Sequence, residues 1–410
     1  MTFSSLRSLA ALFAMTVLIS ACQSSSNSDS STQQKLDKMV DQQWTDFKQE
    51  HAFSKGGMGV RLLTPNGDYF VHQGFETKSE TETLKSATIN THFRGASTAK
   101  TFTAAAIMMM HQQGLLNIDD TLDMNIPKRA EPYLPDTAGN NIPYKDSITI
   151  RQLLQHRAGV FDVKNNPIPE DVDQPYAGQY YADYVMNTLG EDHTFTLEEF
   201  IAVDAVNQLS SNTPNAEFHY SNTGYAILGK IIERISGLSY SEYIQQTFLE
   251  PLNLNDTRFP DLGTDQALPE PYVEGYTIVD DEELETTFIN LSASVAEGNI
   301  MTTPENLTRW LHLLQTYKAG LNKETVSMMN DVILTGEAHY AYGLGITFTE
   351  GLGYGHDGAQ MGYLTTMRYD PKTDVTVLVF TSAILADERF MDHAMLLVDV
   401  AKDAKSIVGY

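Results

Sequence analysis

Ser97 and Lys100 are the residues of this sequence whose types and spacing point most directly to covalent chemistry. They stand in residues 94–100, Arg-Gly-Ala-Ser-Thr-Ala-Lys, and form the only Ser-x-x-Lys pair of the chain. The Ala- and Met-rich run that follows favours a helix ended by Gly114, so we expect Ser97 in the first turn of this helix and Lys100 three residues on, on the same face. Burial and the positive end of a helix both lower the pKa of a lysine, and a neutral Lys100 can act as the base for the Ser97 hydroxyl. We also expect the backbone N–H of Ser97 to help bind an oxyanion.

The same pair fits a plain structural role, with Ser97 capping a helix and Lys100 on its surface. A Ser-x-x-Lys pattern is short enough to arise by chance in a chain of this length. The chemical interpretation therefore depends on partner groups elsewhere in the sequence.

Tyr220 and Asn222 form a second candidate group. Tyr220-Ser221-Asn222 is the only Tyr-x-Asn of the chain, and a helix predicted from about 226 to 235 follows it, ended by Gly237. A tyrosine held near Lys100 can carry a proton to a leaving group, and the Asn222 amide can bind a substrate carbonyl. Alternatively, Tyr220 is a half-buried residue at the start of that helix.

The elements that must position these residues are strands at both ends of the chain and helices between them. Residues 59–63 and 69–72 flank a Pro-Asn-Gly-Asp turn, and 363–369 and 375–381 flank an Asp-Pro turn, so each pair predicts an antiparallel hairpin. Helices are predicted at 32–51, at 149–154, from 303 onward and at 390–405. We therefore expect an α+β fold: one antiparallel sheet from about 34–95 and 335–410, flanked by helices, with an all-helical part inserted. Residues 161–194 predict a long loop or lid, or a solvated surface insertion.

The first residues predict export. An apolar run from Leu9 to Ile19 is too short to span a membrane and ends at Ala21-Cys22, so we expect residues 1–21 to be a signal peptide. The Ile19-Ser20-Ala21-Cys22 boundary resembles the lipobox of bacterial lipoproteins, in which the cysteine is lipidated. Cys22, the only cysteine, would then carry the lipid, and residues 22–33 would form a flexible tether to a hydrolase domain at 34–410. The alternatives are an ordinary signal peptide or a chance cysteine.

Charge and histidine spacing narrow the possible functions. A formal net charge of -26 argues against nucleic acid as a partner and against a basic membrane patch, so only the lipid would reach the membrane. The histidines show neither His-x-His nor His-Glu-x-x-His spacing, and we expect neither a metal nor a cofactor.

A third motif, His356-Asp357-Gly358, completes a pattern that resembles the serine β-lactamase and penicillin-binding protein superfamily. Ser97-x-x-Lys100 matches its first motif, Tyr220-x-Asn222 its second, and His356-x-Gly358 the variant of its third in which Lys-Thr-Gly is commoner. Residues 220–229 and 251–257 look typical of the class C β-lactamase and D-Ala-D-Ala carboxypeptidase branch. The resemblance covers about residues 37–381, with the three motifs in the right order.

This resemblance implies the β-lactamase/transpeptidase-like fold, with the site between the sheet and the helical part. Ser97 would form an acyl-enzyme while Lys100 and Tyr220 exchange protons and Asn222 positions the substrate amide. His356 would line the sheet side of the cleft. The N–H of Ala359 would be the second oxyanion donor, and Gly358 would leave room for a substrate lying along the strand.

The sequence also departs from the family pattern. Gln155-His156-Arg157-Ala158-Gly159 replaces the usual His-Thr-Ser-Gly, a structural segment, and Glu297-Gly298-Asn299 replaces a glycine pair. In the third motif, a largely neutral histidine stands where a lysine is usual. No Lys or Arg occurs between Lys323 and Arg368, so a substrate carboxylate would be bound weakly unless Arg94, Arg157 or Arg368 reaches the cleft.

Three functions remain open. The first is an envelope-anchored serine hydrolase acting on D-amino-acid peptide, amide or ester bonds of small molecules or peptidoglycan fragments, facing the periplasm or the exterior. The second is a carboxylesterase on the same fold. The third is a non-catalytic penicillin-binding lipoprotein, against which the intact Ser97, Lys100 and Tyr220 argue.

Overall fold

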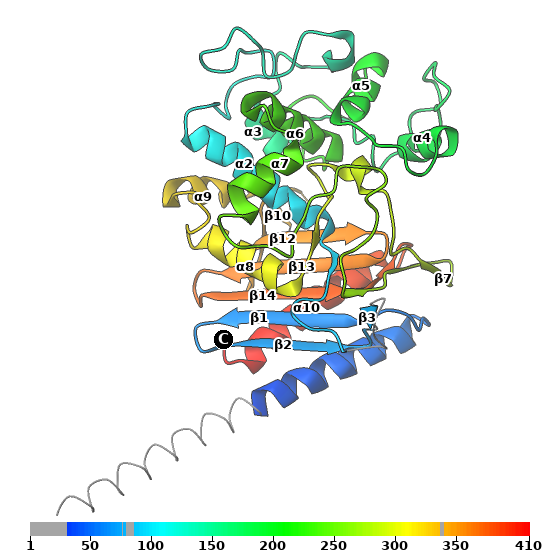
Figure 1. Ribbon diagram of the computed structural model, residues 1–410, viewed down its shortest axis with the longest axis vertical. Helices are drawn as coiled ribbons and strands as arrows, with labels where there is room; N and C mark the ends of the chain where they lie inside the picture. Colours follow the sequence, from blue (N-terminus) through cyan, green and yellow to red (C-terminus); the bar gives the residue numbers. More distant parts are fainter. Residues whose placement is uncertain (1–30, 76, 79–85, 337–339) are drawn as a thin grey trace, which may run out of the picture.

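A computed structural model describes residues 31–75, 77–78, 86–336 and 340–410 of the protein. An eight-stranded antiparallel sheet forms one half of the molecule, and helices form the other half (Figure 1). In spatial order its strands are β2 (Gly67–Gln73), β1 (Met58–Thr64), β14 (Val375–Thr381), β13 (Tyr363–Asp370), β12 (Gly353–Gln360), β11 (Thr347–Thr349), β10 (Ala341–Tyr342) and β9 (Ile333–Leu334). The sheet thus joins the two ends of the chain, as the two predicted hairpins required, and the expected fold class is confirmed.

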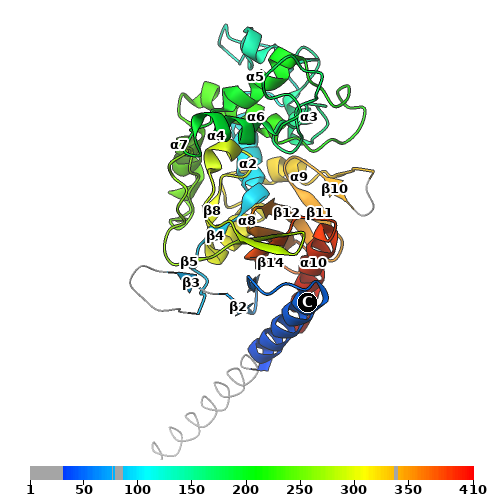
Figure 2. The ribbon, with the colours of Figure 1, turned by 90° about the vertical axis from the view of Figure 1, so that its right-hand side faces the viewer.

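Helices cover both faces of the sheet, because its central strands are apolar on both sides (Figure 2). On β14, Val377 and Val379 face a core that includes Trp44 of the helix over residues 31–50 and the C-terminal helix α10 (Phe390–Ile407). The alternate residues Leu378 and Phe380 face the second core, built on α2 (Ala99–Gln112) and α8 (Pro304–Gln315). This period of two follows from the pleat of the strand.

The helical part packs on the second core, beyond α2 (Figure 1). Its elements are α3 (Ile150–Leu154), α4 (Tyr181–Leu189), α5 (Leu197–Asn207), α6 (Asn222–Ser236), α7 (Tyr240–Ile244), a π-helical turn η3 (Gln245–Leu249) and α9 (Lys323–Met329). Short 3₁₀ turns are η1 (Ala96–Thr98), η2 (Ala138–Asn140) and η4 (Leu291–Ser294). The predicted signals set these boundaries: Thr149 and Thr303 cap α3 and α8, and Gly237 ends α6 in the left-handed conformation.

Two features of the middle of the chain differ from the sequence predictions. Residues 161–194 are not wholly a loop: they contain α4, and Val163, Ile168 and Val185 join a small core against α5. Short strands also occur between the helices, namely β3 (Thr77–Lys78) with β5 (Tyr272–Val273), β4 (Phe93–Arg94) with β8 (Met301–Thr302), and the sheet of β15 (Ala383–Leu385), β6 (Tyr276–Val279) and β7 (Glu282–Glu285). Strands of two to four residues, one of them mostly acidic, carry too weak a pattern to be predicted.

Candidate active site

Ser97 lies at the point where the chain leaves β4 and enters α2. It belongs to the 3₁₀ turn η1, and α2 begins two residues later, so Ser97 precedes the α-helix instead of lying in its first turn. Ala96 adopts a left-handed backbone conformation with φ of 50°, and the Thr98 hydroxyl donates to the Gly95 carbonyl at 2.8 Å. This tight turn holds the partly exposed Ser97 above the fully buried Lys100.

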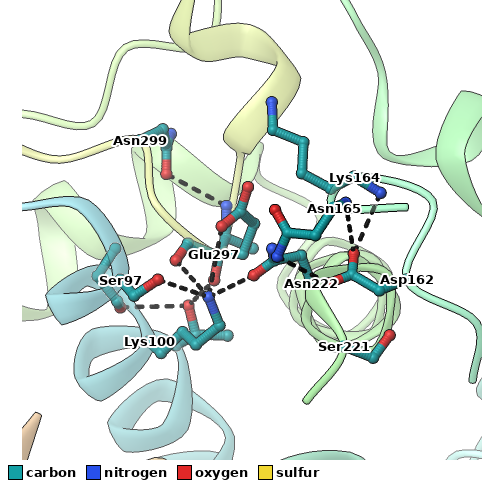
Figure 3. Close-up of polar contacts among 12 residues, drawn as sticks. Ser97, Lys100, Asp162, Lys164, Asn165, Ser221, Asn222, Glu297 and Asn299 are labelled. Carbon is teal, nitrogen blue, oxygen red and sulfur yellow. Dashed lines mark hydrogen bonds and ion pairs between the residues drawn. The ribbon is translucent and has the colours of Figure 1, made fainter. Parts of the chain in front are cut away.

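Lys100 is surrounded by oxygen atoms from three separate segments (Figure 3). Its Nζ lies 3.2 Å from Ser97 Oγ, 2.7 Å from Asn222 Oδ1, 2.8 Å from the Glu297 carbonyl and 3.3 Å from Glu297 Oε2. Burial lowers the pKa of Lys100, and the Glu297 carboxylate acts in the opposite direction. The predicted nucleophile and base are therefore in contact, and a carboxylate stands beside them.

Tyr220 covers Lys100 on the side of the helical part. The lysine nitrogen lies 4.9 Å from the centre of the Tyr220 ring, and the tyrosine hydroxyl shares a hydrogen bond with Ser97. The ring stacks on His156 at 4.1 Å. Burial raises the pKa of Tyr220 well above its ordinary value, so the phenol keeps its proton and can pass one on only as another arrives.

Asn222 is held by the start of α6. Ser221 caps this helix by accepting the Gly224 N–H, and the Asn222 N–H donates to Asp162. Asp162 also accepts the backbone N–H groups of Lys164 and Asn165 (Figure 3). These contacts fix Asn222 with its side-chain oxygen on Lys100, while burial raises the pKa of Asp162 to about 6.

The third motif lies on β12, beside the turn that carries Ser97. A Cβ on Gly358 would be 2.3 Å from the Gly95 carbonyl oxygen and 3.3 Å from the Ala96 Cβ. The expected reason for this glycine, space for substrate, is therefore incomplete: the backbone before Ser97 occupies the space where its side chain would lie. Ala359, whose N–H we predicted to bind the oxyanion, follows Gly358 on the strand and is exposed.

His356 is buried on the same strand and does not present a charge. The Tyr342 hydroxyl lies 2.8 Å from His356 Nε2, and the Asp357 carbonyl lies 2.6 Å from Nδ1. Burial lowers the pKa of His356 to about 4, so the imidazole is neutral at physiological pH.

Each arginine considered for substrate binding already has a hydrogen-bond partner, and the partner of Arg368 is Asp357 of the third motif itself. Arg94 donates to the carbonyls of Thr287 and Gln266, and Arg368 Nη2 donates to the Asp357 carboxylate, 2.8 Å from Oδ1 and 2.7 Å from Oδ2. Arg157 donates to the carbonyl of Leu334 in the edge strand β9.

Sequence reasoning missed Lys164, Asp162 and the role of Glu297 at the lysine. A small pocket of about 10 Å³, room for about one water molecule, is lined by residues that include Lys164, Asn222, Glu297, Phe200, Ser292 and Ala293. The Lys164 Nζ donates to the Ala293 carbonyl at 3.2 Å. In the sequence, the only sign of these residues was that Glu297 stands where the family pattern has a glycine.

Cys22 lies outside the described residues. Among the helices that are described, none has the length and apolar character needed to cross a membrane. Within the same residues, no group of three or more His, Cys, Asp or Glu side chains is arranged to hold a metal ion.

A buried lysine between a serine hydroxyl and a tyrosine, where the start of a helix meets the inner strand β12 of the sheet, is the arrangement of a serine hydrolase that works through an acyl-enzyme. The comparisons with known proteins agree. The Beta-lactamase family profile matches residues 36–402, and the chain belongs to this family.

Among curated proteins, the chain is similar to Penicillin-binding protein 4* of Bacillus subtilis, with 27% identity over 78% of this chain and 66% of the relative. It is also similar to Protein flp of Staphylococcus aureus, with 30% identity over 56% of this chain and 38% of the relative. The matched region thus spans less than two thirds of either relative.

Among solved structures, the fold is similar to D-amino acid amidase from Ochrobactrum anthropi SV3, with a TM-score of 0.70, 21% identity, and 91% and 99% of the two chains covered. It is also similar to an octameric penicillin-binding protein homologue from Pyrococcus abyssi, with a TM-score of 0.64, 24% identity, and 89% and 77% covered.

Proposed function

We propose that this protein is an envelope-anchored serine hydrolase that cleaves amide, peptide or ester bonds of D-amino-acid compounds through an acyl-enzyme on Ser97. The observation that carries the substrate preference is that, among the residues that the structure describes, no arginine or lysine beside the third motif is without a partner. His356 is neutral, and Arg94, Arg157 and Arg368 are bound to other groups. Substrates without a free carboxylate at that position, such as amides and esters, should therefore react better than penicillins or peptides ending in D-alanine.

The contacts around Ser97 support a sequence of proton transfers. A neutral Lys100 takes the hydroxyl proton as Ser97 Oγ attacks the substrate carbonyl. The N–H groups of Ser97 and Ala359 stabilise the oxyanion. Tyr220, hydrogen-bonded to Ser97, passes the proton to the leaving nitrogen or oxygen, and the bond to the leaving group breaks. Water then attacks the ester on Ser97 by the reverse route.

Two solved structures with this fold support the D-amino-acid class. They are those of a D-amino acid amidase from Ochrobactrum anthropi SV3 and a D-stereospecific amidohydrolase from Streptomyces sp.. Simple carboxylic esters are the second candidate, because the same site needs no D-residue to attack them.

A substrate panel tests the proposal. D-phenylalanine amide, L-phenylalanine amide, p-nitrophenyl butyrate, a peptide ending in D-Ala-D-Ala and benzylpenicillin are compared by kcat/KM from pH 5 to 9. We expect D-phenylalanine amide to exceed both its L-form and benzylpenicillin by at least tenfold. If the penicillin is faster by orders of magnitude at pH 8, the preference is contradicted. If only the butyrate ester reacts, the protein is a carboxylesterase.

The anchoring part of the proposal is supported by the lipobox-like boundary at Cys22 and by the polar stretch that follows it. A lipid on Cys22 would hold the site at the membrane surface, beside peptidoglycan fragments.

A further inference from the structure

Glu297 contacts Lys100 twice, through its backbone carbonyl and through its carboxylate. The Lys100 side chain is completely buried and the Glu297 side chain is 10% exposed, so little water separates or screens the two charges. This carboxylate lies where the sequence pattern of the family has a glycine. The proton transfers proposed between Ser97, Lys100 and Tyr220 do not involve it.

The loop that carries Glu297 is tightly held. Ala296, the residue before it, is left-handed with φ of 69°. The Ala296 carbonyl accepts from Thr103 of α2 at 2.6 Å, and its N–H donates to Asn299 Oδ1 at 3.2 Å. Asn299 in turn donates to the Pro260 carbonyl. A strained residue with this many partners indicates that the position of Glu297 is fixed by the fold.

The number of hydrogen-bond donors on Lys100 shows what the carboxylate can do. Asn222 Oδ1 and the Glu297 carbonyl only accept hydrogen bonds, and they take two N–H groups of the lysine. A neutral amine then has its lone pair left for the Ser97 hydroxyl. A cationic amine has a third proton with two acceptors in reach, Ser97 Oγ at 3.2 Å and Glu297 Oε2 at 3.3 Å. Of these two, only the carboxylate is a base that can remove the proton.

We propose that Glu297 is the proton acceptor that makes Lys100 a neutral base without releasing a proton to solvent. The third proton of Lys100 moves from Nζ to Oε2, which leaves a neutral amine and a carboxylic acid. Lys100 next takes the Ser97 proton as the O–C bond forms and gives it up, through Tyr220, as the leaving group departs. A proton from the attacking water follows the same route back to Ser97, so Glu297 keeps its proton until turnover ends.

Other ionisable groups face this pair and belong to the same electrostatic environment. They are Asp162 and Lys164 before α4, His156 after α3, Tyr220 and Tyr225 at α6, Tyr240 on α7, and His356 on β12. Asp162 is the only other carboxylate among these groups, and it does not contact the Lys100 nitrogen. Among the described residues, the only carboxylate at hydrogen-bond distance from Lys100 is that of Glu297.

The test uses a fluorophosphonate, because it modifies an activated serine whatever the natural substrate is. The full chain is incubated with the probe from pH 5 to 10, and intact mass gives the rate at which the P–O bond forms and fluoride leaves. We expect the wild-type rate to be level between about pH 6 and 9. The Glu297 carboxylate also attracts the charge of Lys100 and so raises the lysine pKa. We expect the loss of the proton acceptor to outweigh the loss of this attraction, so Glu297→Gln should be at least tenfold slower at pH 7. Its rate should recover as Lys100 loses its proton to solvent at higher pH.

Two variants and one control separate this role from a structural one. Glu297→Asp keeps a carboxylate and should be faster than Glu297→Gln at pH 7. Glu305→Gln changes a carboxylate that pairs with Arg61, away from the site, and should match wild type. The proposal is overturned if Glu297→Gln equals or exceeds wild type at pH 7. If neither Glu297 variant folds by circular dichroism, a wild-type rate rising tenfold per pH unit from 6 to 8 overturns it.

The inference rests on Ser97 being the nucleophile and not on the substrate class. Failure of the probe to label wild-type Ser97 contradicts the proposed function itself. Normal labelling and normal turnover in Glu297→Gln contradict only the proton relay.

Discussion

Three side chains from segments far apart in the sequence converge on the amine of Lys100. Ser97 precedes it by one turn, Asn222 comes from the start of α6, and Glu297 comes from the loop before β8. The lysine is therefore the residue on which the site is centred, and its environment decides whether Ser97 reacts.

Replacing either Ser97 or Lys100 by alanine should remove nearly all turnover. Ser97 and Lys100 catalyse the same step together, so the loss of either one removes most of the rate enhancement. We therefore expect each change to lower kcat by roughly 10⁴-fold or more. The measurement is hydrolysis of p-nitrophenyl butyrate with intact-mass analysis of the acyl adduct. An adduct that persists on the Ser97→Ala protein would place the nucleophile elsewhere.

At the scale of elements, the position of β12 against the turn η1 sets the distance between the oxyanion donors. Gly358 permits this approach, because the Gly95 carbonyl occupies the place of a side chain. The strand, its glycine and the turn before α2 therefore act as one structural unit.

Gly358→Ala should push β12 away from η1. The added Cβ would be 2.3 Å from backbone oxygen, which cannot move as a flexible side chain would. We expect kcat to fall at least tenfold, with a lower melting temperature. Gly139→Ala, whose new Cβ would meet Ala202 at an ordinary 3.6 Å, is the matched control. Equal activity in the two variants would show that the strand adjusts at little cost.

The elements at this scale were largely predictable, and the reasons are local. The turn at 65–68, the capping residues Thr149 and Thr303, and Gly237 each act within a few residues of their own position. Glu297 was not predictable as a partner of Lys100, because its place depends on a left-handed Ala296 held by Thr103, 193 positions away. The pairing of Arg368 with Asp357 across β12 and β13 was equally hidden until the register was known.

At the scale of the whole molecule, anchoring is the open prediction. Cys22→Ala should release the protein from the membrane fraction, because the proposed lipid would attach to that thiol. Fractionation followed by immunoblotting measures this, and Ser24→Ala, a change within the predicted tether, is the control. Equal partitioning of the Cys22 variant and wild type would mean that another feature holds the protein.

The pairing of β1 with β14 has a consequence for the order of synthesis. Met58 lies opposite Thr381, so this contact cannot form until almost the entire polypeptide has been made. Contacts so distant in sequence also form slowly, because a long loop must close first. A nascent chain that has reached residue 352 already contains Ser97, Lys100, Tyr220 and Glu297, yet it lacks β12 and its neighbours β13 and β14. The serine can therefore be present for much of translation without being able to hydrolyse anything.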